Sequence, residues 1–381
     1  MELAISIIMP VYNEATSIEE SIRSCASQTI ANKCELICVD DGSTDGSAEV
    51  IEALAEELPL TVRVLRQKNQ GSGKARNLGL ASAQGENLAF LDGDDLYPSD
   101  DVLEVLYAKA KETGLPIVGG SIEILRAQGR TPFQPSGPFA KYYAGQVFEE
   151  DGPHTYEDYQ FEFGFYRFIY SRKLIVDNGI EFPDFLRYQD PPFMAHAMAA
   201  GQEFYALAMT TYLYREDGSK QIKWTQRKIC DALAGVLDVA GVATEHGYTQ
   251  LYDNCIHRLC SDFAPRVAEY AIDEDDPSAL EWLQEASDKL VAMGESLGLE
   301  RDERLDRIPT PSNTAKLYEA LKAADQTVVA LRRDKEAAER RVQELEARVN
   351  DFEGSNSWRI GRMVTWAPRA AKGAIQRLLH P

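Results

Sequence analysis

The chain has 381 residues, of which 44% are hydrophobic, which is enough for one large domain with additions or for two domains with buried cores. The formal net charge of -21 at pH 7 excludes a domain-wide basic surface, so we expect no nucleic-acid partner. Six cysteines, with no export signal and no recognised zinc spacing, indicate reduced structural thiols and a cytoplasmic location.

Residues 1–120 alternate short apolar strands with helical patterns. The predicted strands cover 4–9, 35–39, 62–65 and 87–91, and the predicted helices cover 17–28, 48–57 and 72–83. This alternation with short connections predicts an α/β fold, in which a mostly parallel sheet carries helices on both faces. Ligands of such sheets bind beyond the carboxyl ends of the strands. The polar segments 10–14, 40–41 and 92–95 all fall at this edge.

A cluster of acidic residues follows the predicted buried strand 87–91. Asp92, Asp94 and Asp95 stand within four residues of one another. Mg²⁺ or Mn²⁺ takes one or two such carboxylates and leaves its other positions to water and phosphate oxygens. The cluster therefore predicts an enzyme that handles a phosphorylated substrate with Mn²⁺ or Mg²⁺ as its cofactor.

The middle of the chain is less regular and richer in aromatic residues. We predict strands at 116–119, 164–170 and 204–214 and a helix at 193–201. The pattern from 223 to 298 is helical. We therefore expect an N-terminal sheet domain over residues 1–220 and a small α-helical appendage over residues 221–305.

Residues 306–353 carry apolar side chains at alternating spacings of four and three, which is the heptad pattern of a coiled coil. The a positions are Leu321, Val328, Lys335, Val342 and Val349, and the d positions include Leu317, Leu331, Leu345 and Phe352. β-Branched residues at a with Leu at d favour a parallel homodimer, and a single Lys at a sets register at a cost in stability. The alternative is a long helix packed on its own N-terminal domain.

The segment 354–381 is a basic tail without an acidic residue. Aromatic and aliphatic residues alternate with Arg and Lys, which predicts an amphipathic tail at the surface of an anionic membrane. The alternative is a tail that packs on the partner subunit, and Pro368 interrupts any continuous helix. No segment of the chain reaches the roughly 18 apolar residues that a membrane span needs.

Four motifs in a fixed order resemble the family 2 glycosyltransferases of the GT-A fold. They are IIMPVYNE at 7–14, VDDGSTDG at 39–46, GSGKARNLG at 71–79 and FLDGDD at 90–95. The resemblance covers about the first 215 residues. It implies a Rossmann-like GT-A sheet flanked by helices. A weaker resemblance links SWRI at 357–360 to a C-terminal segment of some bacterial polysaccharide glycosyltransferases.

The resemblance implies transfer of a sugar, with inversion, from a nucleotide diphosphate donor. The expected donor is a UDP-sugar, and the expected acceptor is a saccharide or a lipid-linked saccharide used in cell-surface polysaccharide synthesis. Asp94 resembles the aspartate that binds the metal of this family. Asp92 would assist the metal or hydrogen-bond the ribose. The place of action would be the inner face of the plasma membrane.

Further residues resemble the nucleotide-binding positions of the family. Asp41 resembles the aspartate that recognises uracil, and Arg76 resembles a basic residue near the base or the diphosphate. Arg215 lies in a segment, 212–219, that resembles a loop closing over the diphosphate. The wall of the nucleotide site would be formed by Pro10, Tyr12 and Glu14. Taken alone, the pair Asp40-Asp41 could instead serve a turn and a helix cap.

The catalytic base of the family is an acidic residue at the start of a helix, and Asp190 is the matching position. Gln189 precedes it where Glu is frequent in the family. An inverting displacement needs such a base on the acceptor hydroxyl. The alternative is that Asp190 only caps its helix, since Asp before two prolines is a good N-cap.

Two other functions are weighed against this hypothesis. A sugar nucleotidyltransferase would share a related fold, but residues 10–17 lack the Gly-rich phosphate loop that such enzymes carry. A degenerate transferase could act as a dimeric, membrane-associated scaffold. The presence of Asp92, Asp94 and Asp190 argues against the scaffold.

Overall fold

The structure, a computed structural model, describes residues 3–133, 140–216 and 223–310, together with residue 341. The chain divides into two compact units, Met1–Pro311 and Ser312–Pro381. The heptad positions and the tail at 354–381 fall outside the described residues, apart from residue 341, so the dimer and the membrane contact stay predictions. Among the described residues, no helix has the length and apolarity to cross a membrane.

The first half of the sheet is parallel, as residues 1–91 predict. Strands β1 (Ile5–Val11), β2 (Cys34–Asp40), β3 (Thr61–Arg66) and β4 (Asn87–Phe90) pair in the order β3-β2-β1-β4. Helices α1 (Ile18–Ala26), α2 (Ser47–Glu57) and α3 (Ser72–Ser82) connect them. Every residue of β1 and β2 is buried, which is why most of their residues are apolar.

The second half of the sheet is mixed. It continues the order as β4-β8-β5-β9-β7, and β6 pairs with β5. The strands are β5 (Ile117–Arg126), β6 (Gly129–Pro132), β7 (Gly152–Thr155), β8 (Phe168–Ser171) and β9 (Glu203–Arg215). β5 and β9 run parallel, whereas β8 is antiparallel to both β4 and β5. The sheet is thus parallel around the first three motifs and mixed beyond β4.

Several element boundaries differ from the predictions. The expected strand at 164–170 begins only at Phe168, because Phe165–Arg167 form a short 3-10 helix, η3. Helix α7 (Asp190–Gly201) begins three residues before its expected start. The described residues also contain helices that the sequence did not predict, α4 (Val102–Thr113), α5 (Tyr156–Tyr159) and α6 (Arg172–Asp177).

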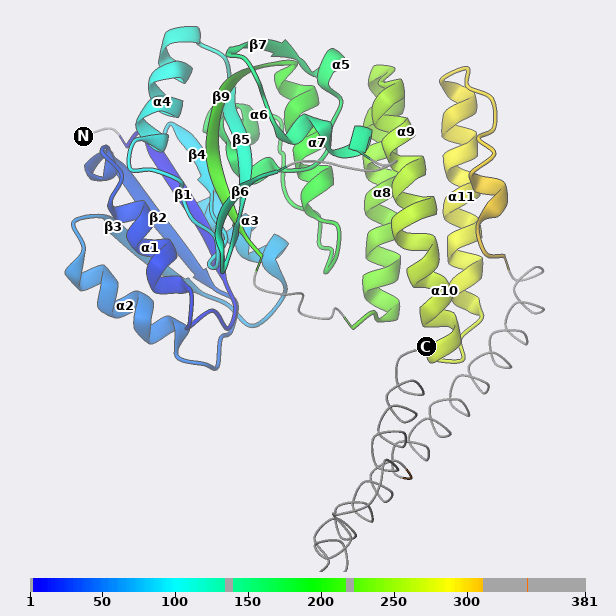
Figure 1. The fold of residues 1–381 in the computed structure, drawn as a ribbon, viewed down its shortest axis with the longest axis horizontal. Coiled ribbons are helices and arrows are strands. Elements are labelled where there is room, and N and C mark those ends of the chain that lie inside the picture. The colour runs from blue at the N-terminus through cyan, green and yellow to red at the C-terminus, as the bar shows by residue number, and fades with distance from the viewer. Residues whose placement is uncertain (1–2, 134–139, 217–222, 311–340, 342–381) are drawn as a thin grey trace, which may run out of the picture. The chain divides into compact units, whose positions relative to one another are not determined.

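The helical region predicted from residue 223 onward is confirmed as a set of helices beside the sheet (Figure 1). Its elements are α8 (Gln226–His246), α9 (Thr249–His257), a π-helical turn η4 (Arg258–Phe263), α10 (Ala264–Asp273) and α11 (Ser278–Ser296). One apolar cluster runs from Phe90 of the sheet through Phe193 of α7 to Val236 of α8 and Leu283 of α11. The helices therefore share a core with the sheet.

A buried ion pair joins the helical region to the loop before β8. The Arg258 Nε donates to a Glu162 oxygen at 3.1 Å, and both side chains are 1% exposed. The Asn254 amide also donates to Glu162, at 2.9 Å. Arg258 lies on the π-helical turn, and its guanidinium packs over the Phe163 ring at 4.3 Å. The pair therefore holds this turn against the loop before β8.

We expect Arg258→Met to lower the free energy of unfolding by about 3–5 kcal/mol, because it leaves Glu162 buried without its cation. Urea denaturation measures this change. The double variant Glu162→Leu/Arg258→Met removes both charges and should lose less stability than the single variant. A single variant as stable as the native protein would contradict the role given to the pair.

Candidate active site

Hydrogen bonds join the loop after β1 to the loop after β2. Asn13 adopts a φ of 57°, and its side-chain oxygen accepts from the Thr44 N–H at 2.8 Å. The Asn13 N–H donates to the Ser43 hydroxyl at 3.1 Å. These bonds hold together the first two family-like motifs. The loop carries the predicted nucleotide-wall residues, with Pro10 buried, Tyr12 48% exposed and Glu14 partly buried.

Asp41 organises a second loop at the same edge of the sheet. One of its oxygens accepts from the Gln67 amide at 2.7 Å and from the Gln70 N–H at 2.8 Å. The other accepts from the Gly71 N–H at 2.8 Å. Asp41 is 3% exposed. Its carboxylate thus holds the segment 67–71 that leads into α3, in addition to any ligand it contacts.

The acidic turn after β4 is held by the end of β9. The Asp95 carboxylate is 1% exposed and accepts from the Tyr212 hydroxyl at 2.6 Å and the Arg215 N–H at 2.7 Å. Burial, with the nearby charges of Asp92 and Asp94, raises the pKa of Asp95 well above its usual value. The Arg215 Nε donates to the Asp94 carbonyl at 2.6 Å. Arg215, predicted at the diphosphate, is therefore anchored to the acidic turn.

Arg76 is a buried cation with unused donors. It is 4% exposed, and its Nη2 donates to Asp92 at 2.6 Å. Its guanidinium lies over the rings of Phe165 and Phe182, at 5.0 and 5.3 Å. Burial, the largest single effect, acts to lower the pKa of Arg76, but the charge and hydrogen bond of Asp92, together with the charge of Asp190, raise the pKa overall. Nε and Nη1 have no partner among the described residues, which points to a ligand that accepts hydrogen bonds.

Asp190 is the first residue of α7, and Gln189 is the residue that precedes the helix. The alternative that Asp190 caps this helix is therefore wrong, because the cap position is one residue earlier. Burial raises the pKa of Asp190, while the charges of Arg76 and Arg187 oppose the rise. The Gln189 amide donates to the Ser72 hydroxyl at 2.8 Å, which ties the start of α7 to α3.

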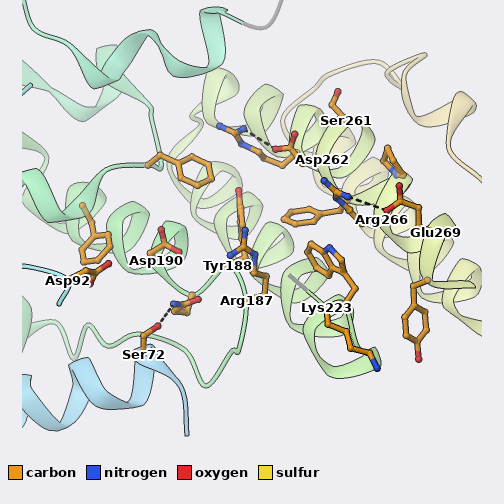
Figure 2. A pocket seen from close by; sticks show the side chains of 18 of the residues that line it. Ser72, Asp92, Arg187, Tyr188, Asp190, Lys223, Ser261, Asp262, Arg266 and Glu269 are labelled. Atoms are coloured by element: carbon orange, nitrogen blue, oxygen red, sulfur yellow. Dashed lines mark hydrogen bonds and ion pairs between the residues drawn. The ribbon is translucent and has the colours of Figure 1, made fainter. Parts of the chain in front are cut away.

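A pocket of about 1290 Å³ opens at this edge of the sheet (Figure 2). Of the predicted site residues, Arg76, Asp92 and Asp190 line it. The remaining predicted residues are not part of its lining. Pro10 and Arg215 lie at the ends of β1 and β9, and the others lie on the loops after β1, β2 and β4: Tyr12, Glu14, Asp41 and Asp94. The structure therefore brings the predicted base and the first carboxylate of the acidic turn together in one cavity.

The pocket also contains residues that sequence reasoning missed. Tyr188 has a φ of 65°, and its buried hydroxyl has no partner among the described residues. Gly235 of α8 makes room for it, since a Cβ there would lie 2.7 Å from the Tyr188 carbonyl oxygen. Trp224 and Arg266 come from the helical region. No motif marked these residues, although Tyr188 stands two positions before the predicted base.

The acidic turn fits a divalent cation of the Mg²⁺ class. The described residues contain no group of three or more acidic, Cys or His side chains placed to hold a metal by themselves. Mg²⁺ is usually bound by one or two carboxylates together with substrate phosphates, so two aspartates suffice. Asp92 is paired with Arg76. Asp92 and Asp94 are the two carboxylates predicted to contact such a cation.

Comparison with known sequences identifies the sheet domain. Residues 6–174 match the profile described as Glycosyl transferase family 2. Residues 6–174 of the chain are those of a family 2 glycosyltransferase domain. It is 32% identical over 214 residues to the uncharacterized glycosyltransferase EpsJ of Bacillus subtilis, a match that covers 56% of this chain and 61% of EpsJ. It is 27% identical over 223 residues to the poly(ribitol-phosphate) beta-glucosyltransferase of Bacillus spizizenii, covering 57% and 33% of the two chains.

A solved structure shares the fold of this family 2 chain. The S. aureus TarS 1-349 structure in complex with UDP-GlcNAc superposes with a TM-score of 0.62 at 20% identity, covering 80% of this chain and 83% of TarS. The GT-A fold expected from the motifs is confirmed. The sequence matches span less than two thirds of the relatives, at 61% of EpsJ and 33% of the Bacillus spizizenii protein.

We expect Asp41→Ala to loosen the segment 67–71, because it removes the acceptor of the Gln70 and Gly71 N–H groups. Unfolding in urea should show a loss of about 1–3 kcal/mol. Hydrogen exchange of these amides should accelerate. Asp45→Ala is a matched control, because Asp45 accepts from the Ser47 N–H in a different loop. Unchanged exchange at 70 and 71 would refute the role of Asp41.

Proposed function

We propose that the protein transfers a sugar from a UDP-sugar to a hydroxyl of a saccharide or lipid-linked acceptor, with inversion, in the synthesis of a cell-surface polysaccharide. One observation carries this proposal: Arg76, Asp92 and Asp190 line a single pocket at the carboxyl edge of the sheet. Membership of family 2 supports it. The bound UDP-GlcNAc of TarS, which shares the fold, supports the choice of donor.

Asp190 is the proposed base. The acceptor oxygen forms a bond to the anomeric carbon while the bond from that carbon to the diphosphate oxygen breaks, and Asp190 takes the hydroxyl proton. A carboxylate whose pKa is raised by burial is a stronger base than one in water. The charges of Arg76 and Arg187 oppose this rise.

The departing diphosphate needs positive charge. Arg76 lines the pocket and supplies positive charge there, and two of its buried guanidinium nitrogens have no partner among the described residues. Asp94, with Asp92 beside it, would hold Mn²⁺ or Mg²⁺, whose charge would stabilise the leaving group when bound. The carbonyl of Asp94 is fixed by Arg215, so this turn is held in place before any ligand binds.

We expect Asp190→Asn to lower kcat by about 10²–10⁴-fold, because it removes the base and keeps the size of the side chain. UDP release from a panel of UDP-sugars with Mn²⁺ measures turnover, and calorimetry should show that UDP still binds. The control is Asp184→Asn, because Asp184 is an exposed aspartate of the preceding loop.

Asp94→Ala should abolish the effect of Mn²⁺ on UDP binding. If no UDP-sugar of the panel releases UDP and UDP itself does not bind, the assignment of a UDP-sugar as the donor is refuted.

The pH profile offers an independent test of the base. Asp190 must be ionised to act, so kcat/KM falls as the pH drops through its raised pKa. Arg187→Gln removes a charge that lowers this pKa, so the acid limb of the profile should move to higher pH. The exposed Arg227→Gln is the control. If the acid limb of the kcat/KM profile lies at the same pH in Arg187→Gln as in the native protein, the coupling between Arg187 and Asp190 is contradicted.

A further inference from the structure

We propose that the end of the pocket formed by the helical region is the acceptor site, and that it takes a neutral oligosaccharide rather than a single sugar or a polyanion. The inference rests on the proposed function in one respect, since Asp190 marks the end at which the acceptor hydroxyl reacts. The other observations that support the inference concern the part of the pocket beyond Asp190.

The pocket is long, and its two ends come from different parts of the fold. In Figure 2, Asp92 and Asp190 lie at one end and Arg266 and Glu269 at the other, with Arg187 between them. The far end is built on α10 and the segment before α8. These elements carry none of the family-like motifs, so their side chains can determine which acceptor binds.

The size of the cavity indicates more than one sugar unit. Its volume of about 1290 Å³ exceeds the roughly 300–1,000 Å³ of a pocket for a drug-sized ligand. The loops expected to hold the nucleotide, at 10–14 and 41, are outside its lining. The space beyond the donor sugar is therefore available to the acceptor.

The lining combines aromatic faces with charged hydrogen-bonding groups. Trp224 and Tyr270 line the far end, and the Arg187 guanidinium lies 6.0 Å from the Trp224 ring. Pyranose rings present apolar C–H faces and polar hydroxyl rims. Aromatic rings accommodate the faces, and a few placed polar side chains fix the rims. This combination suits a saccharide.

The balance of charge favours a neutral acceptor. Beyond Asp190, the lining contains four basic side chains, Arg187, Lys223, Arg258 and Arg266, and four acidic ones, Asp262, Glu269, Asp273 and Glu274. Two of the basic groups are in ion pairs, Arg258 with Asp262 at 3.0 Å and Arg266 with Glu269 at 3.2 Å. A polyanion would meet as much repulsion as attraction here. Charged groups of both signs can hydrogen-bond neutral hydroxyls.

Tyr188 supplies a second, independent indication of a ligand between the two ends. Its side chain is 7% exposed, and the hydroxyl lacks a hydrogen-bond partner among the described residues. Its φ of 65° is unfavourable for a residue with a bulky side chain. Such backbone strain and unsatisfied polar atoms cluster at ligand sites. Tyr188 thus marks the middle of the groove as a place where a polar ligand binds.

The test is direct binding to the full chain, measured by calorimetry and tryptophan fluorescence. The probes are linear neutral oligomers of glucose, galactose, mannose and N-acetylglucosamine, from one to six units, and ribitol-phosphate oligomers of equal length. We expect at least one neutral series to bind more tightly as it lengthens beyond one unit. Trp224→Ala should weaken that binding about tenfold or more through loss of the aromatic face, and Trp224→Phe should retain most of it.

A pair of surface arginines provides the matched control. Arg266→Ala should weaken oligosaccharide binding, whereas Arg301→Ala should not, although both arginines are in local ion pairs on exposed surfaces. Circular dichroism of each variant separates misfolding from loss of contact. The proposal is overturned if no neutral series binds, if length has no effect, if Trp224→Ala binds like the native protein, or if the ribitol-phosphate oligomers bind more tightly.

The design separates this inference from the proposed function, because binding needs no turnover. Oligosaccharide binding that depends on Trp224, without release of UDP from any donor, would refute the transferase and retain the saccharide groove. Turnover of a UDP-sugar with an acceptor KM that Trp224→Ala leaves unchanged would retain the transferase and refute the groove.

Discussion

The hydroxyl of Tyr212 determines where the acidic turn lies. It accepts from the Asp92 N–H at 3.2 Å and donates to the Asp95 carboxylate at 2.6 Å. Tyr212 is itself fully buried on β9. β4 and β9 are not neighbours in the sheet, since β8 and β5 lie between them. Together with the backbone N–H and the Nε of Arg215, this hydroxyl connects the turn after β4 to a strand three positions away.

Arg76 is the electrostatic counterpart of that turn. It is buried beneath the pocket, pairs with Asp92 and also lowers the pKa of Asp190, so one cation is shared by two carboxylates. The single positive charge of Arg76 cannot neutralise all of these carboxylates. The excess negative charge of Asp92, Asp94 and Asp190 suits a site that receives a cation together with a phosphorylated donor.

The helical region makes the site a pocket rather than an open edge. The ion pair of Glu162 and Arg258 holds the π-helical turn against the loop before β8, and Tyr188 packs edge-to-face on Phe263 of that turn. Gly235 of α8 allows the close approach of Tyr188. The segment that contains Tyr188 and leads to Asp190 is thus held in place by contacts with the helical region. We regard this bracing as the physical link between the two parts of the fold.

The α/β class, the early strands and the helical region could be predicted from the sequence, because strand period and helical period are local signals. The strand-end motifs also led to family 2 and to Asp92, Arg76 and Asp190 as candidate site residues. Three features became visible only in the folded chain: Asp95 and Arg215 anchor the acidic turn, Asp41 holds the segment 67–71, and the sheet becomes mixed beyond β4. The tertiary structure alone brought Trp224 and Arg266 to the pocket of Asp190. Those facts depend on contacts between residues far apart in the chain, and such contacts leave no periodic pattern in a single sequence.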